Sequence, residues 1–392
     1  MEFLKKVGLL PRLVIAIVLG IVVGLVAPLP VIQVAATFNS IFGQFLNFCV
    51  PLIIIGFITP GIADLGQGAG KTLAITTLVA YVSTIISGSV AYLVDTTIFP
   101  LFLEEGSLML SNPTNPEETL ISGLFTIEMT PVMGVMTALV FSFIAGLGIA
   151  ATKGEVLKKA FTEFQAIIEK VIGVALIPLL PVHVFGIFAN MTFAGTVFEI
   201  MSVFIKVFVV IIILHVAIIL FQYTLAGAAN KKNPIAMIKN MLPAYATAIG
   251  TQSSAATIPV TLACTKKNEV SDEVAEFVVP LCATIHLSGS TITLTSCALA
   301  IMMLQGWDYS FGIMFPFILM LGVTMVAAPG VPGGAVMAAL GILGSMLLFD
   351  DTMLALMIAL YIAQDSFGTA CNVTGDGAIA ALIDAWKKGL KK

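Results

Sequence analysis

Charged residues are scarce in this sequence, at 10% of 392 residues, whereas a typical soluble domain has about 25%. Hydrophobic residues make up 59%, and the mean hydropathy is +1.08. This composition excludes an ordinary soluble domain and predicts a polytopic membrane protein with one integrated unit over residues 1–392. The net charge of −4 is small and does not indicate a partner, and there is no basic patch that would suggest nucleic acid. The expected surroundings, from the apolar composition, are a lipid bilayer.

Three further absences limit the class of protein and the kinds of site that it can have. No CxxC spacing occurs, and the cysteines lie in or beside apolar stretches, so we interpret them as packing residues rather than disulfide partners. No GxSxG motif occurs, which argues against a hydrolase that uses Ser253 or Ser254 with His286. Arginine occurs once, as Arg12. The cysteines are Cys49, Cys264, Cys282, Cys297 and Cys371.

Apolar stretches of membrane-spanning length fill the first part of the chain. Lys5, Lys6 and Arg12 precede the first apolar run, a pattern that a signal peptide shares. Because the chain that follows is equally apolar, we interpret this run as a first transmembrane helix. The stretches are 8–28, 41–63, 73–102, 124–151, 163–191 and 196–227.

The pattern changes after residue 230. Segments 234–264 and 311–347 are apolar at both ends, with small or polar residues, Gly and Pro between them. Segments 274–304 and 350–386 contain the polar interruptions HLSGS and DSFGTACNVTGD. All four are predicted to be broken or re-entrant. Paired interruptions of this kind are typical of a transporter site.

Charge placement predicts the topology. The stretch between the third and fourth spans contains four glutamates and no Lys or Arg, whereas other segment ends are basic. By the positive-inside rule we expect a protein of the cell membrane with both termini on the cytoplasmic side. Alternation works only with eight spans and two hairpins, at about 234–264 and 311–347. The basic ends are at Lys5, Lys6, Lys71, Lys153, Lys158, Lys159, Lys231, Lys232, Lys266, Lys267 and 387–392.

A polar stripe marks the last segment. Asp365, Thr369, Asn372 and Asp376 are spaced four, three and four residues apart, which places them on one helical face. At membrane depth such a face points into the protein. Asp365 suits a substrate ammonium group, and the oxygens of Asn372 and Asp376 suit a small cation. The alternative is a polar contact between helices.

The hairpin tips suit a carboxylate. Ser253 and Ser254 precede Ile258-Pro259 in the first, and the second reads PGVPGG from Pro329. Helices that begin at these breaks present free backbone N–H groups to an anion. His286, in the seventh span, is either a hydrogen-bonded structural residue or a titratable group that couples protons to transport.

Four motifs together resemble those of the dicarboxylate/amino acid:cation symporters, the family of the glutamate transporters and their bacterial relatives. They are SSAATIPV from Ser253, ATIHLSG from Ala283, PGVPGG from Pro329 and NVTGD from Asn372. The resemblance covers the whole chain and is closest to the serine/threonine:sodium branch. It implies an all-α inverted-repeat fold, a homotrimer, and an elevator motion with substrate held between the hairpin tips.

The resemblance also implies roles for regions and residues. A scaffold would lie mainly within 1–72 and 120–230, and a transport core within 73–102 and 231–392. Substrate contacts would come from Ser253, Ser254, Ser290, Val331, Gly333, Ala335, Asp365, Gly368, Thr369 and Asn372. Sodium sites would involve Cys282, Thr284, His286, Met325, Val326, Ala328, Asn372 and Asp376.

Departures from the family pattern are equally informative. Members with acidic substrates carry an arginine three residues after the aspartate, where this chain has Gly368, and often another where it has Gln252. Without a guanidinium, a second carboxylate would be buried beside Asp365 with no matching cation. His286 and Ser288 replace residues of a deep sodium site, which predicts fewer coupled sodium ions.

These observations predict a sodium-coupled symporter that imports a small neutral amino acid such as serine, threonine or alanine. It would not be an enzyme, and it would need no organic cofactor. The alternatives are proton coupling through His286 and an acidic amino acid or dicarboxylate substrate. More remote alternatives are the intramembrane hydrolase and an ion channel.

Overall fold

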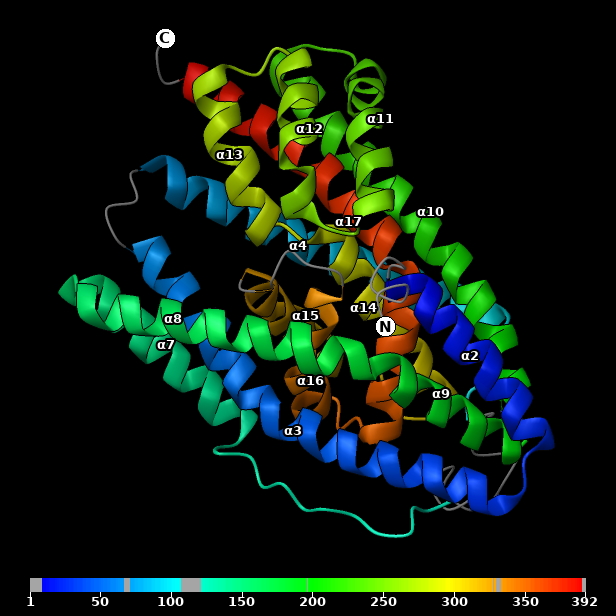
Figure 1. The fold of residues 1–392 in the computed structure, drawn as a ribbon. Coiled ribbons are helices and arrows are strands. Elements are labelled where there is room, and N and C mark those ends of the chain that lie inside the picture. Colours follow the sequence, from blue (N-terminus) through cyan, green and yellow to red (C-terminus); the bar gives the residue numbers. More distant parts are fainter. Residues whose placement is uncertain are drawn as a thin grey trace.

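The computed structural model describes residues 9–66, 71–106, 121–195, 197–326, 328 and 333–389, and these contain α-helices and no β-strand (Figure 1). The helices of the first half are α2 (Leu9–Val26), α3 (Leu29–Gly66), α4 (Lys71–Ile98), α7 (Val135–Thr152), α8 (Glu155–Val171), α9 (Ile177–Phe193) and α10 (Val197–Asn230). Those of the second half are α11 (Pro234–Thr251), α12 (Ser254–Lys267), α13 (Asp272–Ile285), α14 (Ser288–Leu304), α15 (Phe311–Val326), α16 (Gly334–Met346) and α17 (Asp351–Gly389).

Six helices among the described residues are long and apolar enough to cross a membrane. They are α3, α4, α10, α17, the continuous pair α8–α9, and the pair α13–α14 taken together across the short break between them. Helices α2 and α7 have 18 residues each, which is within the range of about 17–25 residues for a span. Counting both gives the eight predicted spans, and the count of eight stays a prediction.

The predicted span at 124–151 begins too early. Helix α7 starts at Val135, and residues 121–134 are not helical. Side chains of two helices bind this segment, because Thr37 Oγ1 accepts from Leu124 N at 2.8 Å and Asn190 Oδ1 accepts from Ile121 N at 2.9 Å. Pro131 also disfavours a helical conformation at the residue before it. Apolar composition alone does not show these features.

The prediction of an interrupted last segment is also wrong, because α17 is one continuous helix of 39 residues. Its polar side chains find partners without a break: Thr374 Oγ1, for example, donates to the Ala370 carbonyl at 2.7 Å. In contrast, the predicted break of the seventh span is confirmed, since α13 ends at Ile285 and α14 begins at Ser288. Both predicted hairpins are also present, as α11–α12 and α15–α16.

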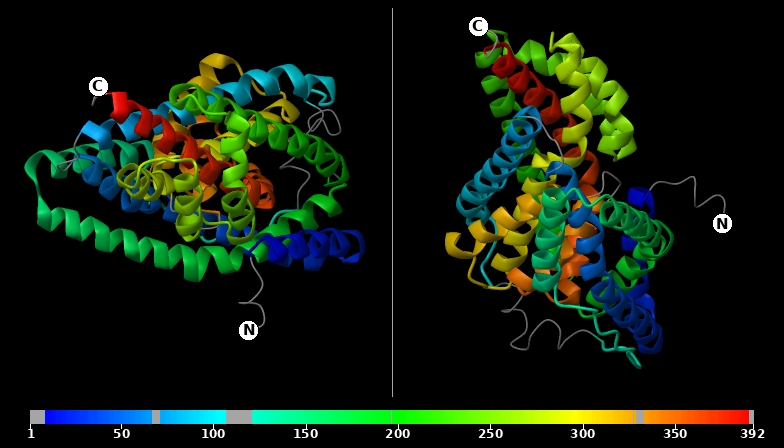
Figure 2. Two further views of the ribbon diagram at one scale, coloured as in Figure 1. Left: turned by 90° about the horizontal axis from the view of Figure 1, so that it is seen from above. Right: turned by 90° about the vertical axis from the view of Figure 1, so that its left-hand side faces the viewer.

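The helices pack in two groups. Helices α2, α3, α7, α8 and α9 pack mainly on one another, whereas α4 packs on α14 and α15. Helix α10 packs on α17, α11 and α14, and α17 also contacts α12 and α13. Helices α4 and α8–α9 lie on opposite sides of the molecule (Figure 2). Every residue of α14 is buried, so α14 and α17 form the centre of the fold.

Ion pairs gather at the end of the molecule formed by α11–α13 and the C-terminal part of α17 (Figure 1). Lys232 contacts Glu269 at 2.8 Å, and this contact lowers the pKa of Glu269. Lys266 contacts Glu276 at 2.7 Å. Exposed pairs of this kind add little stability. These ion pairs indicate that this end of the helix bundle faces water.

Candidate substrate and cation site

Two hairpin tips meet α17 at adjacent residues. Gln252, at the tip between α11 and α12, donates from Nε2 to Ser366 Oγ at 3.1 Å. Gly333, at the start of α16, donates from its backbone N–H to Asp365 Oδ2 at 2.7 Å. Segments about eighty residues apart along the chain thus converge on one turn of the central helix, as the sequence predicts for a site between the tips.

The first tip is held by its own polar groups. Gln252 adopts a left-handed backbone conformation with φ +52°, which ends α11. Ser253 Oγ then accepts a hydrogen bond from Ala256 N at 3.2 Å and caps α12. Thr257 Oγ1 donates to the Ser253 carbonyl at 2.8 Å. Of the two predicted substrate ligands here, Ser254 is buried, and Ser253 is the helix cap.

The second tip contacts the site through its backbone. Gly333 has φ +73°, a conformation that an L side chain adopts only with strain. Its N–H points at Asp365, and the N-terminal end of α16 favours a negative charge there. Ala335, a further predicted contact, is buried on the first turn of α16. Val331 lies outside the described residues.

The predicted substrate residues of α14 and α17 lie together and are buried. Asp365 interacts with the hydroxyl groups of Tyr361 and Thr369. Tyr361 also donates to Ser290 Oγ at 2.8 Å, and Asn372 Nδ2 donates to the same oxygen at 2.9 Å. Ser290 therefore links Asp365, through Tyr361, to Asn372. The sequence alone does not indicate a role for Tyr361, because this residue lies in the apolar part of α17.

Asn372 holds the start of α14. Its Oδ1 accepts from the N–H groups of Gly289 at 2.8 Å and Ser290 at 3.3 Å, which caps a buried helix end. The predicted cation ligand is thus engaged with backbone amides in this structure. A side chain at Gly289 would clash, since a Cβ there would lie 2.5 Å from the Gly368 carbonyl oxygen. In contrast, a Cβ on Gly368 would lie at least 3.6 Å from the nearest atoms of α14, which is an ordinary contact distance.

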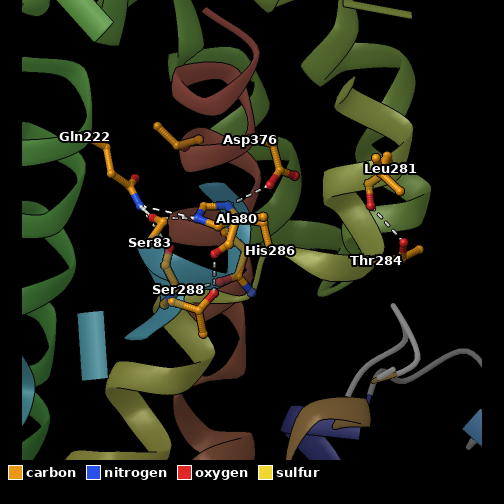
Figure 3. A network of polar contacts seen from close by, with 12 residues as sticks. Ala80, Ser83, Gln222, Leu281, Thr284, His286, Ser288 and Asp376 are labelled. Atoms are coloured by element: carbon orange, nitrogen blue, oxygen red, sulfur yellow. Dashed lines mark hydrogen bonds and ion pairs between the residues drawn. The ribbon is translucent and has the colours of Figure 1, made fainter. Parts of the chain in front are cut away.

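His286 occupies the break between α13 and α14 and is fully buried (Figure 3). Its Nδ1 lies 3.0 Å from Asp376 Oδ1, and its Nε2 lies 3.1 Å from Ser83 Oγ of α4. Gln222 of α10 donates from Nε2 to Ser83 Oγ at 3.0 Å and to Ser288 Oγ at 3.3 Å. The network therefore joins α4, α10, α14 and α17.

Two oxygens of this network remain available. Asp376 Oδ2 and Gln222 Oε1 are buried and have no hydrogen-bond partner among the described residues. The packing around them is tight, because a Cβ on Gly375 would lie 2.7 Å from both His286 Cε1 and Gln222 Oε1. Glycine is therefore needed at this position for His286 and Gln222 to approach α17.

The other predicted sodium residues are more scattered. Thr284 is exposed, donates to the Leu281 carbonyl at 2.8 Å, and lies apart from His286 (Figure 3). The Cys282 carbonyl accepts from His286 N at 2.9 Å. Met325, Val326 and Ala328 end the first arm of the second hairpin, where Ala328 N donates to the Met325 carbonyl at 3.3 Å. Their role as a second sodium site stays a prediction.

Comparison with known proteins gives a consistent set of relatives. The model of the sodium:dicarboxylate symporter family matches residues 9–386. The serine/threonine transporter SstT of Acinetobacter baumannii strain AYE is 27% identical over 401 residues, covering 98% of both chains. Excitatory amino acid transporter 1 of Ambystoma tigrinum is 29% identical over 289 residues, covering 70% of this chain and 52% of its own length.

Proposed function

We propose that this chain, which belongs to the sodium:dicarboxylate symporter family, imports a small neutral amino acid such as serine, threonine or alanine together with sodium. Family membership makes it a multi-pass membrane transporter rather than an enzyme, and it implies sodium as the coupling ion. The choice of substrate within the family is the part that the site geometry has to support.

The observation that carries the proposal is the buried carboxylate of Asp365 between two hairpin tips. It offers one negative charge for one ammonium group, and the helix starts at Ser254 and Gly333 offer N–H groups for one carboxylate. Gly368 brings no side chain, and Gln252 is bonded to Ser366. A second substrate carboxylate would find no guanidinium there, because the one arginine, Arg12, is on α2.

The packing supports a division into scaffold and transport core. Helices α2, α3, α7, α8 and α9 would form the scaffold of a homotrimer, and the remaining helices the core of an elevator. The family resemblance implies a scaffold that includes residues 120–230, and α10 falls within that range. We assign α10 to the core instead, because it packs on α17, α11 and α14 and supplies Gln222 to the His286 network. We place both termini in the cytoplasm and the protein in the cell membrane.

Sodium would bind beside α17, where Asp376 Oδ2 is buried with no hydrogen-bond partner among the residues that the structure describes. His286 fills the space next to the other oxygen, which supports the expectation of fewer coupled sodium ions than in glutamate transporters. The same pair favours one alternative, in which His286 and Asp376 couple protons instead. The two alternatives differ in which gradient drives uptake.

Uptake of labelled L-serine into proteoliposomes tests the proposal. Under an inward sodium gradient we expect accumulation that unlabelled alanine and threonine inhibit and aspartate does not. Accumulation driven by a pH gradient alone would favour coupling through His286. Aspartate uptake without serine uptake would contradict the substrate assignment. A Gly368→Arg variant sharpens the result, since it should lose serine uptake and make aspartate a competitor.

A further inference from the structure

Asp95 is a buried carboxylate that the proposed substrate and sodium sites do not use. It lies on α4, one turn before the helix ends at Ile98, and its side chain has no exposed surface. Neither carboxylate oxygen has a hydrogen-bond partner among the described residues. An ionised carboxylate is costly in such a place unless a cation neutralises it. Intramembrane carboxylates of this kind typically mark ion pathways.

Other buried oxygens without partners lie on the helices that face Asp95. Helix α4 packs on α14, where the Ser296 hydroxyl lies beside the Asp95 carboxylate without forming a hydrogen bond of regular geometry among the described residues. The hydroxyl oxygens of Ser296 and Thr295 and the side-chain oxygen of Gln364 on α17 are also buried and have no hydrogen-bond partner in the part of the chain that the structure describes. Gln364 belongs to the same neighbourhood, since its Nε2 lies 3.7 Å from the sulfur of Cys297, which also interacts with Asp95.

The acidic side chains at this end of α4 and α14 face water, which screens their charge from the cluster. Glu105 and Asp308, beyond the ends of α4 and α14, are acidic and exposed. Lys206 of α10 has its Nζ 5.7 Å from the centre of the Phe102 ring. The remaining titratable neighbours on α14 and α17 are Cys297 and Tyr361, and Tyr361 also interacts with Asp365. A polar connection therefore runs from Asp95 towards the proposed substrate site.

We propose that Asp95, with the oxygens of Ser296 and Gln364, forms a second cation site of the transport core, which takes up a small hard cation, either sodium or a proton. Oxygen donors suit such a cation and do not suit soft metals. The site is distinct from the pair formed by His286 and Asp376, because His286 precedes the first turn of α14 and Ser296 lies in the middle of that helix. The inference rests on the proposed function for its role in coupling, although cation binding itself is tested without substrate.

The first experiment measures the unfolding temperature of the purified full-length protein without any amino acid. One titration varies sodium at constant ionic strength and pH, and the other varies pH at constant sodium. Asp95→Asn removes the charge and keeps the shape, and Asp308→Asn is the control for an exposed carboxylate at the same end. We expect Asp95→Asn to weaken one of the two dependences at least tenfold, which identifies the cation, and Asp308→Asn to behave as wild type.

The proposal would be overturned if a folded Asp95→Asn variant kept the wild-type dependence of the unfolding temperature on both sodium and pH. If that variant does not fold, Ser296→Ala replaces it, with an expected weakening of at least threefold in one titration; no change there would overturn the site too. In proteoliposomes, Asp95→Asn should reduce the charge moved per serine by one. A wild type that takes up no serine would contradict the proposed function, while the substrate-free titrations would still decide the cation site.

Discussion

The two hairpins reach the same turn of α17 by different means. The tip between α11 and α12 is polar: Gln252 bonds Ser366 through its side chain, and Ser253 caps the next helix. The start of α16 is apolar and buried from Gly334 to Leu343, and its contact with Asp365 comes from a backbone N–H. The first tip is therefore held by side chains, whereas the described end of the second tip contacts α17 through the backbone of Gly333.

This difference shows where a substrate can compete. The Gly333 N–H occupies a position on Asp365 Oδ2 that a substrate ammonium group would need. The first tip makes its bond to Ser366, one residue away. An amino acid would thus replace a contact of the second tip and add to those of the first. Four substitutions test this comparison.

The largest effect is expected from Asp365→Asn. This change keeps the shape of the side chain but leaves a substrate ammonium group without its counter-charge. Losing one partner of a buried charge pair costs about 2–5 kcal/mol, so serine affinity should fall at least about thirtyfold. Binding of serine to the purified variant by calorimetry gives the measurement. Asp350→Asn, near the start of α17, is the control, and an unchanged serine affinity in Asp365→Asn would remove Asp365 from the site.

The second prediction concerns the glycine of the second tip. Gly333→Ala places a side chain on a residue with φ +73°, at a cost of about 1–2 kcal/mol, and should weaken serine binding about five- to thirtyfold. Gly250→Ala, just before the first tip, is the matched control, because it is helical and a Cβ there meets open space. Alanine should be neutral or stabilising at Gly250. Equal losses in serine affinity would show that the tips do not differ in this way.

Residue spacing predicts the part of the site that lies on one helix. Asp365, Thr369 and Asn372 share a face because helical geometry fixes the positions of residues three and four apart. The hairpins are equally predictable, because Gly, Pro and serine clusters interrupt apolar segments locally. The family resemblance adds the pairing of the two tips with α17, which local patterns do not contain.

Partners on distant helices could not be predicted. Ser83 and Gln222 contact His286 across separations of 203 and 64 residues, and the only local signal is a polar residue within an apolar span. The continuity of α17 was mispredicted for a related reason. Its polar residues are satisfied by neighbouring helices and by the preceding turn, and the sequence of α17 alone does not show those partners.

The third prediction tests the side-chain bond of the first tip. Gln252→Ala removes the hydrogen bond to Ser366 Oγ and should cost about 1 kcal/mol, or roughly a fivefold loss in serine affinity. Ser366→Ala removes the other partner, and the double variant completes a thermodynamic cycle. A coupling free energy of about 0.5–1.5 kcal/mol is expected if the bond holds the tip in place. Strictly additive losses would mean that the two side chains act independently.

The smallest effect is expected at Ser253, where the structure and the family resemblance suggest different roles. Because Ser253 caps α12, its replacement by alanine should lower the free energy of unfolding by about 1 kcal/mol. Asparagine caps a helix as well as serine does, so Ser253→Asn should keep wild-type stability, and Thr247→Ala, within α11, is a neutral control. The decisive comparison is serine affinity in the asparagine variant. A wild-type serine affinity in this variant would mean that Ser253 only holds the first tip in place. A loss of affinity at an unchanged unfolding temperature would mean that the Ser253 hydroxyl contacts the substrate. The first tip would then bind substrate through a side chain, where the second tip uses its backbone.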